Sequence, residues 1–184
     1  MNRTPYILLS LVLLLIGAGV LSCKKETTAS NSSNPNVLPP LTHEGKNTFG
    51  CKVNGEVWVA YAPFTVGGAV AITGEFNSGA GHLEATLRTE TKHEVIKLFF
   101  KDVYSTGMYN FFLVSNTKTG FVYFLDPPDC SIYYHDTSNV GTMNITNLDH
   151  LSRIMSGTFE MDLVNSSCPG DTIKIREGRF DWRY

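Results

Sequence analysis

Hydrophobic and polar positions alternate with a period of two residues along most of the chain from Phe49 onward. The clearest runs are 82–90, 95–103 and 158–164, where apolar residues fall on one face and polar or charged residues on the other. This period is typical of half-buried β-strands, because successive side chains of a strand point to opposite faces. Gly, Asn, Ser and Pro separate the runs at roughly 8–12 residues, the spacing typical of sandwiches and barrels. We therefore predict an all-β domain, an antiparallel meander of about ten strands that forms a β-sandwich or a partly open barrel.

Local patterns predict how some of these strands are joined. Asn54-Gly55 lies between two β-prone runs, which is the strongest short signal for a two-residue hairpin. Segments 108–115 and 121–126 are predicted to pair as a second hairpin around 116–120. Residues 147–152 have the only helical pattern of the domain and predict one short helical turn.

The C-terminal segment 171–184 changes the face that its apolar residues occupy. They stand at odd positions before Glu177-Gly178 and at even positions after it. A change of parity requires an inserted residue, and a glycine-containing β-bulge supplies one. The segment is therefore either a pair of strands or one long bulged strand.

The first 22 residues have the layout of a secretory signal peptide. Arg3 precedes an apolar run at 7–16, and small residues follow at 17–19. The apolar stretch is shorter than the roughly 20 residues of a membrane-spanning helix. Val20-Leu21-Ser22-Cys23 resembles the lipobox of bacterial lipoproteins. This resemblance implies that Cys23 receives lipid and becomes the mature N-terminus; an ordinary cleaved signal and a retained anchor helix are the alternatives.

Residues 23–40 are predicted to be a lipidated cysteine followed by a disordered linker, because Thr, Ser, Asn and Pro dominate and few apolar residues are present. The single folded domain would then span 41–184. The membrane is the expected partner, reached through the N-terminal lipid. Lys24-Lys25-Glu26 is a partial match to the charged segments that direct Bacteroidota lipoproteins to the cell surface, although it is also an ordinary start to a polar linker. We expect a location in the cell envelope, at the outer membrane, facing the periplasm or the surface.

Charge and cysteine content limit the classes of partner and the disulfides that the protein can form. The chain has 184 residues and a net charge of −2. It has no basic block, which argues against a nucleic-acid partner. Lipidation of Cys23 would leave three cysteines and at most one disulfide. Cys130 and Cys168 adjoin proline-containing turns whereas Cys51 lies in a strand-like run, so we predict a Cys130–Cys168 disulfide and a buried free thiol at Cys51. The cysteines lack the CxxC spacing of a metal site.

Three stretches of the chain resemble a family of Bacteroidota lipoproteins classed as a domain of unknown function. They are 41–58, 145–149 leading into 154–160, and 178–181. The resemblance implies an exported, lipid-anchored, all-β protein. It implies no activity and no known site, so it transfers no functional residue.

Acidic residues and a histidine cluster between 126 and 136. Asp126, Asp129, His135 and Asp136 could together bind a divalent cation, although a polar turn explains them more simply. His135-Asp136 does not predict a catalytic triad, because neighbouring residues of a strand point to opposite faces and no GxSxG motif is present. We predict no metal site, no cofactor and no catalytic residue.

Two other sets of side chains are candidates for chemistry or binding. Glu160 and Asp162 share a strand face and could act as a carboxylate pair in glycoside hydrolysis, although a solvated strand face is the simpler explanation. Aromatic residues on both faces of the strands between 108 and 135 are the best candidates for a binding wall for sugars or small apolar ligands; a core with an aromatic excess is the alternative. The candidates are Phe112, Phe121, Tyr123, Tyr133 and Tyr134.

The expected function is a non-catalytic β domain that binds a small molecule, a glycan or a protein at the envelope. An envelope hydrolase acting on glycan or lipid is one alternative, and it requires polar side chains from different strands to converge in a pocket. A structural or adhesion module is another, and it requires an open sheet edge or a large apolar face.

Overall fold

The alternating segments form β-strands in the computed structural model, which describes residues 36–63, 70–111, 121–124, 130–135, 141–165 and 167–184. This part of the chain contains no α-helix. Its eleven strands are β1 (Thr48–Val53), β2 (Glu56–Val59), β3 (Ile72–Asn77), β4 (Ala80–Arg88), β5 (His93–Phe100), β6 (Gly107–Phe111), β7 (Phe121–Phe124), β8 (Ile132–His135), β9 (Gly141–Asp149), β10 (Ile154–Asn165) and β11 (Thr172–Arg183).

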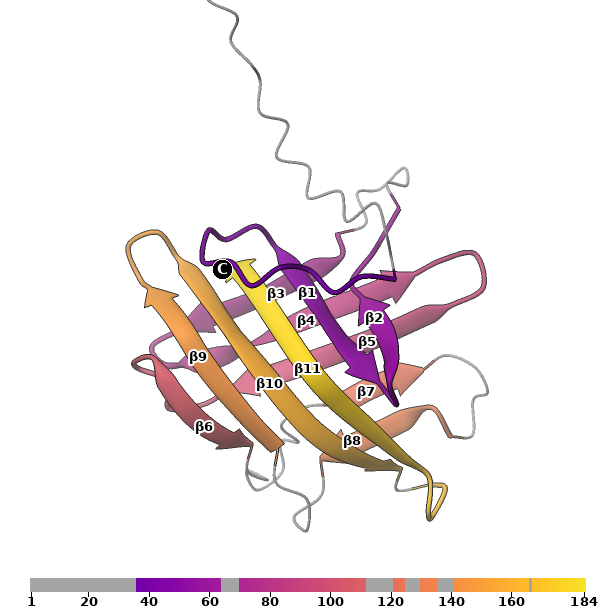
Figure 1. Cartoon of the computed structure of the whole chain (residues 1–184). Coiled ribbons are helices and arrows are strands. Elements are labelled where there is room, and N and C mark those ends of the chain that lie inside the picture. Colours follow the sequence, from indigo (N-terminus) through magenta and orange to yellow (C-terminus); the bar gives the residue numbers. More distant parts are fainter. Residues whose placement is uncertain (1–35, 64–69, 112–120, 125–129, 136–140, 166) are drawn as a thin grey trace, which may run out of the picture.

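The long strand β10 joins two layers of sheet. It pairs with β11 along one edge; along the other it pairs with β9 over 154–160 and with β8 over 163–165. The ladder divides at this point, so β6-β9-β10-β11-β1-β2 forms one layer and β8-β7-β5-β4-β3 forms the other. Figure 1 shows β3, β4 and β5 crossing behind the first layer. The predicted all-β fold is confirmed as a sandwich of antiparallel strands that does not close into a barrel.

The core lies between the layers and uses the faces that the alternation predicts. Leu83, Ile96 and Leu98 from one layer are fully buried, as are Leu163 and Ile175 from the other. Burying a side chain of this size contributes about 1.5–3 kcal/mol relative to leaving it in water. Aromatic rings also meet across the layers, and the planes of Phe100 of β5 and Trp182 of β11 are inclined by 14°.

Two turn predictions are confirmed. Val53 pairs with Glu56, and Asn54 and Gly55 both have positive φ, so Asn54-Gly55 forms the two-residue turn between β1 and β2. The C-terminal segment is one long strand, β11, in which Glu177 has a φ of 52°. The registers of β11 with β1 and with β10 both shift beside Glu177. The β-bulge therefore absorbs the change of parity that the sequence requires.

The predicted helical turn at 147–152 is wrong. Residues 147–149 belong to β9, and Leu148 pairs with Met155 of β10. The Asp149 carboxylate accepts hydrogen bonds from the backbone N–H groups of Leu151 and Ser152. An acidic side chain bonded two and three residues onward closes a tight turn as readily as it caps a helix, and the strand pairing on both sides selects the turn here.

The predicted hairpin between 108–115 and 121–126 is also wrong. Strand β6 pairs with β9, whereas β7 pairs with β5 and β8. The first strand, β1, pairs with the last, β11, so the sheet is not a simple meander. The turn-forming residues at 116–120 lie outside the described residues. A turn signal is local, and it does not determine which strand edges finally pair.

The carboxylate of Asp181 connects the N-terminal segment to the two central strands. Asp181 is 1% exposed and accepts five hydrogen bonds. Burial alone would raise the pKa of this carboxyl group, but the hydrogen bonds outweigh burial and lower it. The donors are the hydroxyls of Thr42 (2.6 Å) and Ser156 (2.8 Å) and the backbone N–H groups of Glu44 (3.1 Å), Gly45 (2.8 Å) and Lys46 (3.1 Å).

We call residues 39–47 the N-terminal strap, because they lie across the edge of the folded domain before β1 begins. Pro39 is buried against Gly50 of β1, so the packed chain begins before residue 41. Arg183 donates hydrogen bonds to the carbonyl groups of Glu44 and Ser152. The strap, the β9–β10 turn and the C-terminus therefore lie at the same end of the sandwich, as Figure 1 shows.

Replacing Asp181 with Asn should destabilise the protein by about 3 kcal/mol at pH 7, because five donors lose a charged acceptor and the new NH₂ group faces them. The folded pKa lies below the unfolded value of about 3.9. The carboxylate therefore stabilises the fold above about pH 4, and this contribution is lost as the pH falls through the folded pKa. Urea unfolding of wild type and D181N should show a difference that shrinks toward acid.

Asp102 is exposed and makes no side-chain hydrogen bond or ion pair with the described residues, so D102N is a matched control that should change stability by less than about 0.5 kcal/mol. A D181N deficit that stayed constant from pH 7 to pH 3 would contradict the role given to the Asp181 charge.

A disulfide joins Cys130 and Cys168, the pair predicted from the sequence, with Cα atoms 5.8 Å apart. It connects the start of β8 to the turn between β10 and β11, at the place where the second layer meets β10. Cys51 is free and fully buried, and burial raises the pKa of its thiol. The buried thiol therefore behaves as a small apolar group of the core.

The double substitution of Cys130 and Cys168 with Ser should lower the free energy of unfolding by about 2–4 kcal/mol, because the disulfide closes a 38-residue loop in the unfolded chain. Denaturant unfolding with and without dithiothreitol measures the effect. The reductant should destabilise wild type and leave the double variant unchanged. Equal sensitivity of both proteins to the reductant would contradict the assignment.

Candidate functional site

The outer face of the first layer, turned away from the core, is hollowed across β6, β9, β10 and β11. The hollow has a volume of about 320 Å³. We call it the outer groove. It is lined by Met108 of β6, Thr142 and Asn144 of β9, Thr158, Phe159 and Glu160 of β10, and Glu177, Gly178 and Arg179 of β11.

Strand register brings the lining residues together. Asn144 pairs with both Met108 and Thr158, and Thr158 also pairs with Arg179, so these four residues form a row across four strands. Glu160 pairs with Thr142 in the next row of the same face. These positions alternate with core residues such as Phe159, so their outward direction follows from the strand period.

The bulge of β11 shapes one side of the groove. The register of β10 with β11 shifts between Phe159 and Met161, next to Glu160. Gly178 packs against the Phe159 ring there, and a Cβ atom added at Gly178 would lie 2.6 Å from that ring. The absence of a side chain at Gly178 therefore allows β10 and β11 to stay close while Glu177 bulges outward.

Cations near the groove already have partners. Lys52 lies 2.5 Å from the Glu177 carboxylate. The Arg179 guanidinium donates to the carbonyl groups of Pro39 and Glu177, and a nitrogen lies 3.9 Å from the Glu177 carboxylate. Arg176 lies 2.6 Å from Asp162, and this contact is the main reason that the Arg176 pKa is raised.

The side chains in the middle of the groove differ from those at its rim. Within the described part of the chain, Thr142, Asn144, Thr158 and Glu160 make no side-chain hydrogen bond and no ion pair with protein. Glu160 is exposed and the other three are half-buried. The groove thus presents a free carboxylate and three neutral hydrogen-bonding groups to a ligand. The described lining includes no histidine, and its second acid, Glu177, is paired with Lys52.

The structure places the aromatic candidates for ligand binding in different environments. Tyr133 is 8% exposed and its hydroxyl donates to the Asp171 carboxylate. Burial and this hydrogen bond raise the Tyr133 pKa, and the side chain is part of the core. Tyr134 is half-buried and pairs with Phe121 on the neighbouring strand. Tyr123 pairs with Ile132, but the side chains of Phe121 and Tyr123 are not described, and Phe112 lies outside the described residues.

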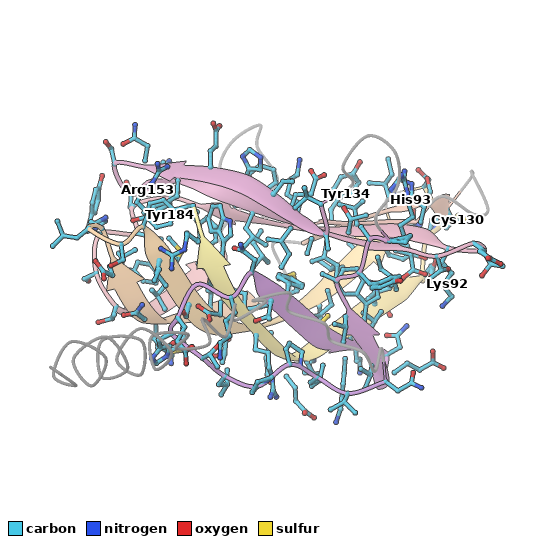
Figure 2. The ribbon with its side chains drawn as sticks, turned by 90° about the horizontal axis from the view of Figure 1, so that it is seen from above. Lys92, His93, Cys130, Tyr134, Arg153 and Tyr184 are labelled. Atoms are coloured by element: carbon cyan, nitrogen blue, oxygen red, sulfur yellow. A yellow bond between two sulfur atoms is a disulfide. The ribbon has the colours of Figure 1, made fainter. Side chains whose placement is uncertain are left out.

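Tyr133 and Tyr134 cannot belong to one binding wall, because neighbouring residues of β8 point to opposite faces of the sheet. Figure 2 shows Tyr134 in the half of the sandwich that contains Cys130, His93 and Lys92, whereas Arg153 and Tyr184 lie at the opposite end. The aromatic wall stays a prediction for Tyr134 and its neighbours on β7.

The acidic candidates are not brought together into one described site. Asp126, Asp129 and Asp136 lie outside the described residues, and the side chain of His135 in β8 is not described. The described residues contain no group of three or more His, Cys, Asp or Glu side chains placed to hold a metal ion. The described residues also contain no helix that is long and apolar enough to cross a membrane.

Glu160 and Asp162 point outward from β10, as their spacing predicts, but only Asp162 has an ion-pair partner. The other groove residues, Met108, Asn144, Thr158 and Arg179, were not singled out from the sequence. Each is an ordinary outward residue of its own strand. They become a site only through the pairing of β6 with β9 and of β9 with β10, which the local pattern does not contain.

No family model, curated protein or solved structure matches the chain. The resemblance to a Bacteroidota lipoprotein family therefore stays a prediction. Its segments 41–58, 145–149, 154–160 and 178–181 lie in the strap, β1, β2, β9, β10 and β11, which belong to the first layer. They contain Asp181 with its donors Thr42 and Ser156, and much of the outer groove.

Substitutions in the middle of the groove should leave folding intact. Glu160→Gln and Thr158→Ala remove no hydrogen bond that the described protein makes, so each should change the free energy of unfolding by less than about 0.5 kcal/mol. Arg179→Ala is the contrasting variant at the rim, and it should cost about 1 kcal/mol through the lost contacts with Pro39 and Glu177. Urea unfolding at neutral pH measures all three. A large loss in E160Q would show that Glu160 serves the fold.

Proposed function

We propose that this protein is an exported, lipid-anchored lipoprotein of the cell envelope whose β-sandwich binds a ligand or partner without catalysing a reaction. The observation that carries the binding role is the outer groove, whose central polar side chains make no hydrogen bond and no direct ion pair within the described protein. Polar groups that have no protein hydrogen bond are available to a ligand.

The same groove favours binding over hydrolysis. A glycoside hydrolase of the usual kind needs two carboxyl groups on opposite sides of the scissile bond. Glu160 is the free acid at the centre of the groove, while Asp162 is held by Arg176 and Glu177 is held by Lys52. A hydrolase built on Glu160 and Asp162 would therefore have to break an ion pair before it could act.

The N-terminal sequence supports the anchor. Arg3, the apolar run 7–16 and Cys23 follow the order of a lipoprotein signal. Two or three acyl chains on Cys23 would make membrane attachment effectively permanent. Thirteen residues, 23–35, would then separate the lipid from the described domain, with a reach of at most about 45 Å.

The N-terminal strap would connect residues 23–35 to the folded domain. Pro39 packs on β1, and Asp181 accepts four hydrogen bonds from residues 42–46. A domain fastened in this way is presented to the envelope from the strap end. We expect the outer membrane as the site of anchoring, with the domain facing the periplasm or the cell surface.

Metabolic labelling with an alkyne analogue of palmitate tests the anchor. Wild type should be labelled and should fractionate with membranes, whereas Cys23→Ala should lose the label, because Cys23 is the proposed acceptor. Cys51→Ala is the matched control and should keep the label, since Cys51 is buried in the core. Failure of wild type to take up label would refute the lipid anchor. Protease treatment of intact cells then separates the two orientations, since only a surface-facing domain is cleaved.

A further inference from the structure

We propose that the outer groove binds a neutral, hydroxyl-rich ligand, a saccharide, and that Glu160 is its central contact. This inference rests on the binding role proposed above and names the class of ligand for the same site. It follows from the kinds of side chain that the groove leaves free and from the charges at its rim.

The free groups match what a saccharide offers. Glu160 supplies a carboxylate that accepts hydrogen bonds from hydroxyl groups, and Asn144 supplies one donor group and one acceptor. Thr142 and Thr158 supply hydroxyls that act as either. Adjacent strands lie about 5 Å apart, so groups in the two rows can reach several hydroxyls of one ligand at once. A ligand with alternating donors and acceptors along its length satisfies all four side chains.

The charges exclude anionic ligands. The cations nearest the groove, Lys52, Arg176 and Arg179, are engaged by Glu177, Asp162 and backbone carbonyl groups. The charge at the centre is the negative charge of Glu160, which makes no direct ion pair among the described residues and acts on Arg176 only through its charge. Phosphates, acidic polysaccharides and nucleic acids would bring like charge against Glu160, which is unfavourable.

The lining also disfavours an apolar ligand. Met108 is 67% exposed and provides the apolar side chain that stands out from this face, whereas Phe159 at the floor is 2% exposed. A lipid tail would therefore gain little burial and would cover four polar side chains without bonding them, which is costly. The thioether of Met108 instead offers a small adaptable surface to the C–H face of a sugar ring.

The size of the groove indicates a short segment of ligand. Its volume of about 320 Å³ is at the lower limit for pockets that hold small molecules. Because the groove is shallow and has no exposed aromatic ring to stack on a sugar, we expect weak affinity, with a Kd of about 1 mM.

Titration of the full-length protein in detergent solution, followed by backbone amide chemical shifts, tests this proposal. The probes are the neutral tetrasaccharides of glucose, mannose and N-acetylglucosamine, with spermidine as a cationic and tetragalacturonate as an anionic comparison. A neutral tetrasaccharide should shift the amides of 142–144, 158–160 and 177–179, and tetragalacturonate should not. Glu160→Gln should weaken binding about fivefold to tenfold, because it removes a charged acceptor.

Glu75→Gln is the matched control, since Glu75 is an exposed carboxylate on β3 in the other layer, and it should bind like wild type. Absence of shifts with every neutral tetrasaccharide would overturn the proposal. Binding of spermidine alone, weakened by E160Q, would overturn the saccharide class while leaving the groove as a binding site. Saccharide binding that is insensitive to E160Q would overturn the assignment to the groove. None of these results depends on labelling of Cys23, so the anchor and the ligand class fail separately.

Discussion

The buried carboxylate of Asp181 is the interaction on which the arrangement of the first layer depends. A charged group in the interior is costly unless hydrogen bonds replace its water shell, and here five donors do so. The donors come from the strap and from Ser156 of β10, while Asp181 itself belongs to β11. One side chain therefore fixes the entry of the chain, and the pairing of the two central strands, at the same end of the sandwich.

From that end, β10 and β11 run together across the whole layer, and the groove lies where their register shifts. The bulge at Glu177 moves its carboxylate to Lys52, on the far side of β11 from Glu160. Arg176 forms its direct ion pair with Asp162, and Glu160, two residues earlier on the same face, acts on Arg176 through its charge without a direct contact. Two acids of the same strand thus differ in their direct contacts, although both lie on the face that carries the groove.

Much of the fold can be predicted from local pattern. The alternation at 82–90 and 158–164, the Asn54-Gly55 turn and the parity change at Glu177-Gly178 each depend on residues close in sequence, and each appears in the structure. The pairing of β6 with β9 and of β5 with β7 does not depend on residues close in sequence, and the local pattern did not predict it. Pairing between distant strands depends on which apolar faces can be buried together, and a turn signal between two strands carries no information about that. The helical turn at 147–152 failed for a related reason, since the Asp149 side chain supports a tight turn and a helix start equally well.

The candidate site was even harder to predict from local sequence than the strand pairing. Aromatic residues and acid clusters attract attention in a sequence because of their chemistry, yet Tyr133 serves the core and Asp162 serves an ion pair. Availability for a ligand is decided by what each side chain already contacts. Thr158 and Asn144 are inconspicuous in the sequence, and they form one surface with Glu160 because β9 and β10 align the three side chains. Arg179 lies at the rim of this surface and also donates a hydrogen bond to the carbonyl group of Pro39, so one side chain connects the groove to the N-terminal strap.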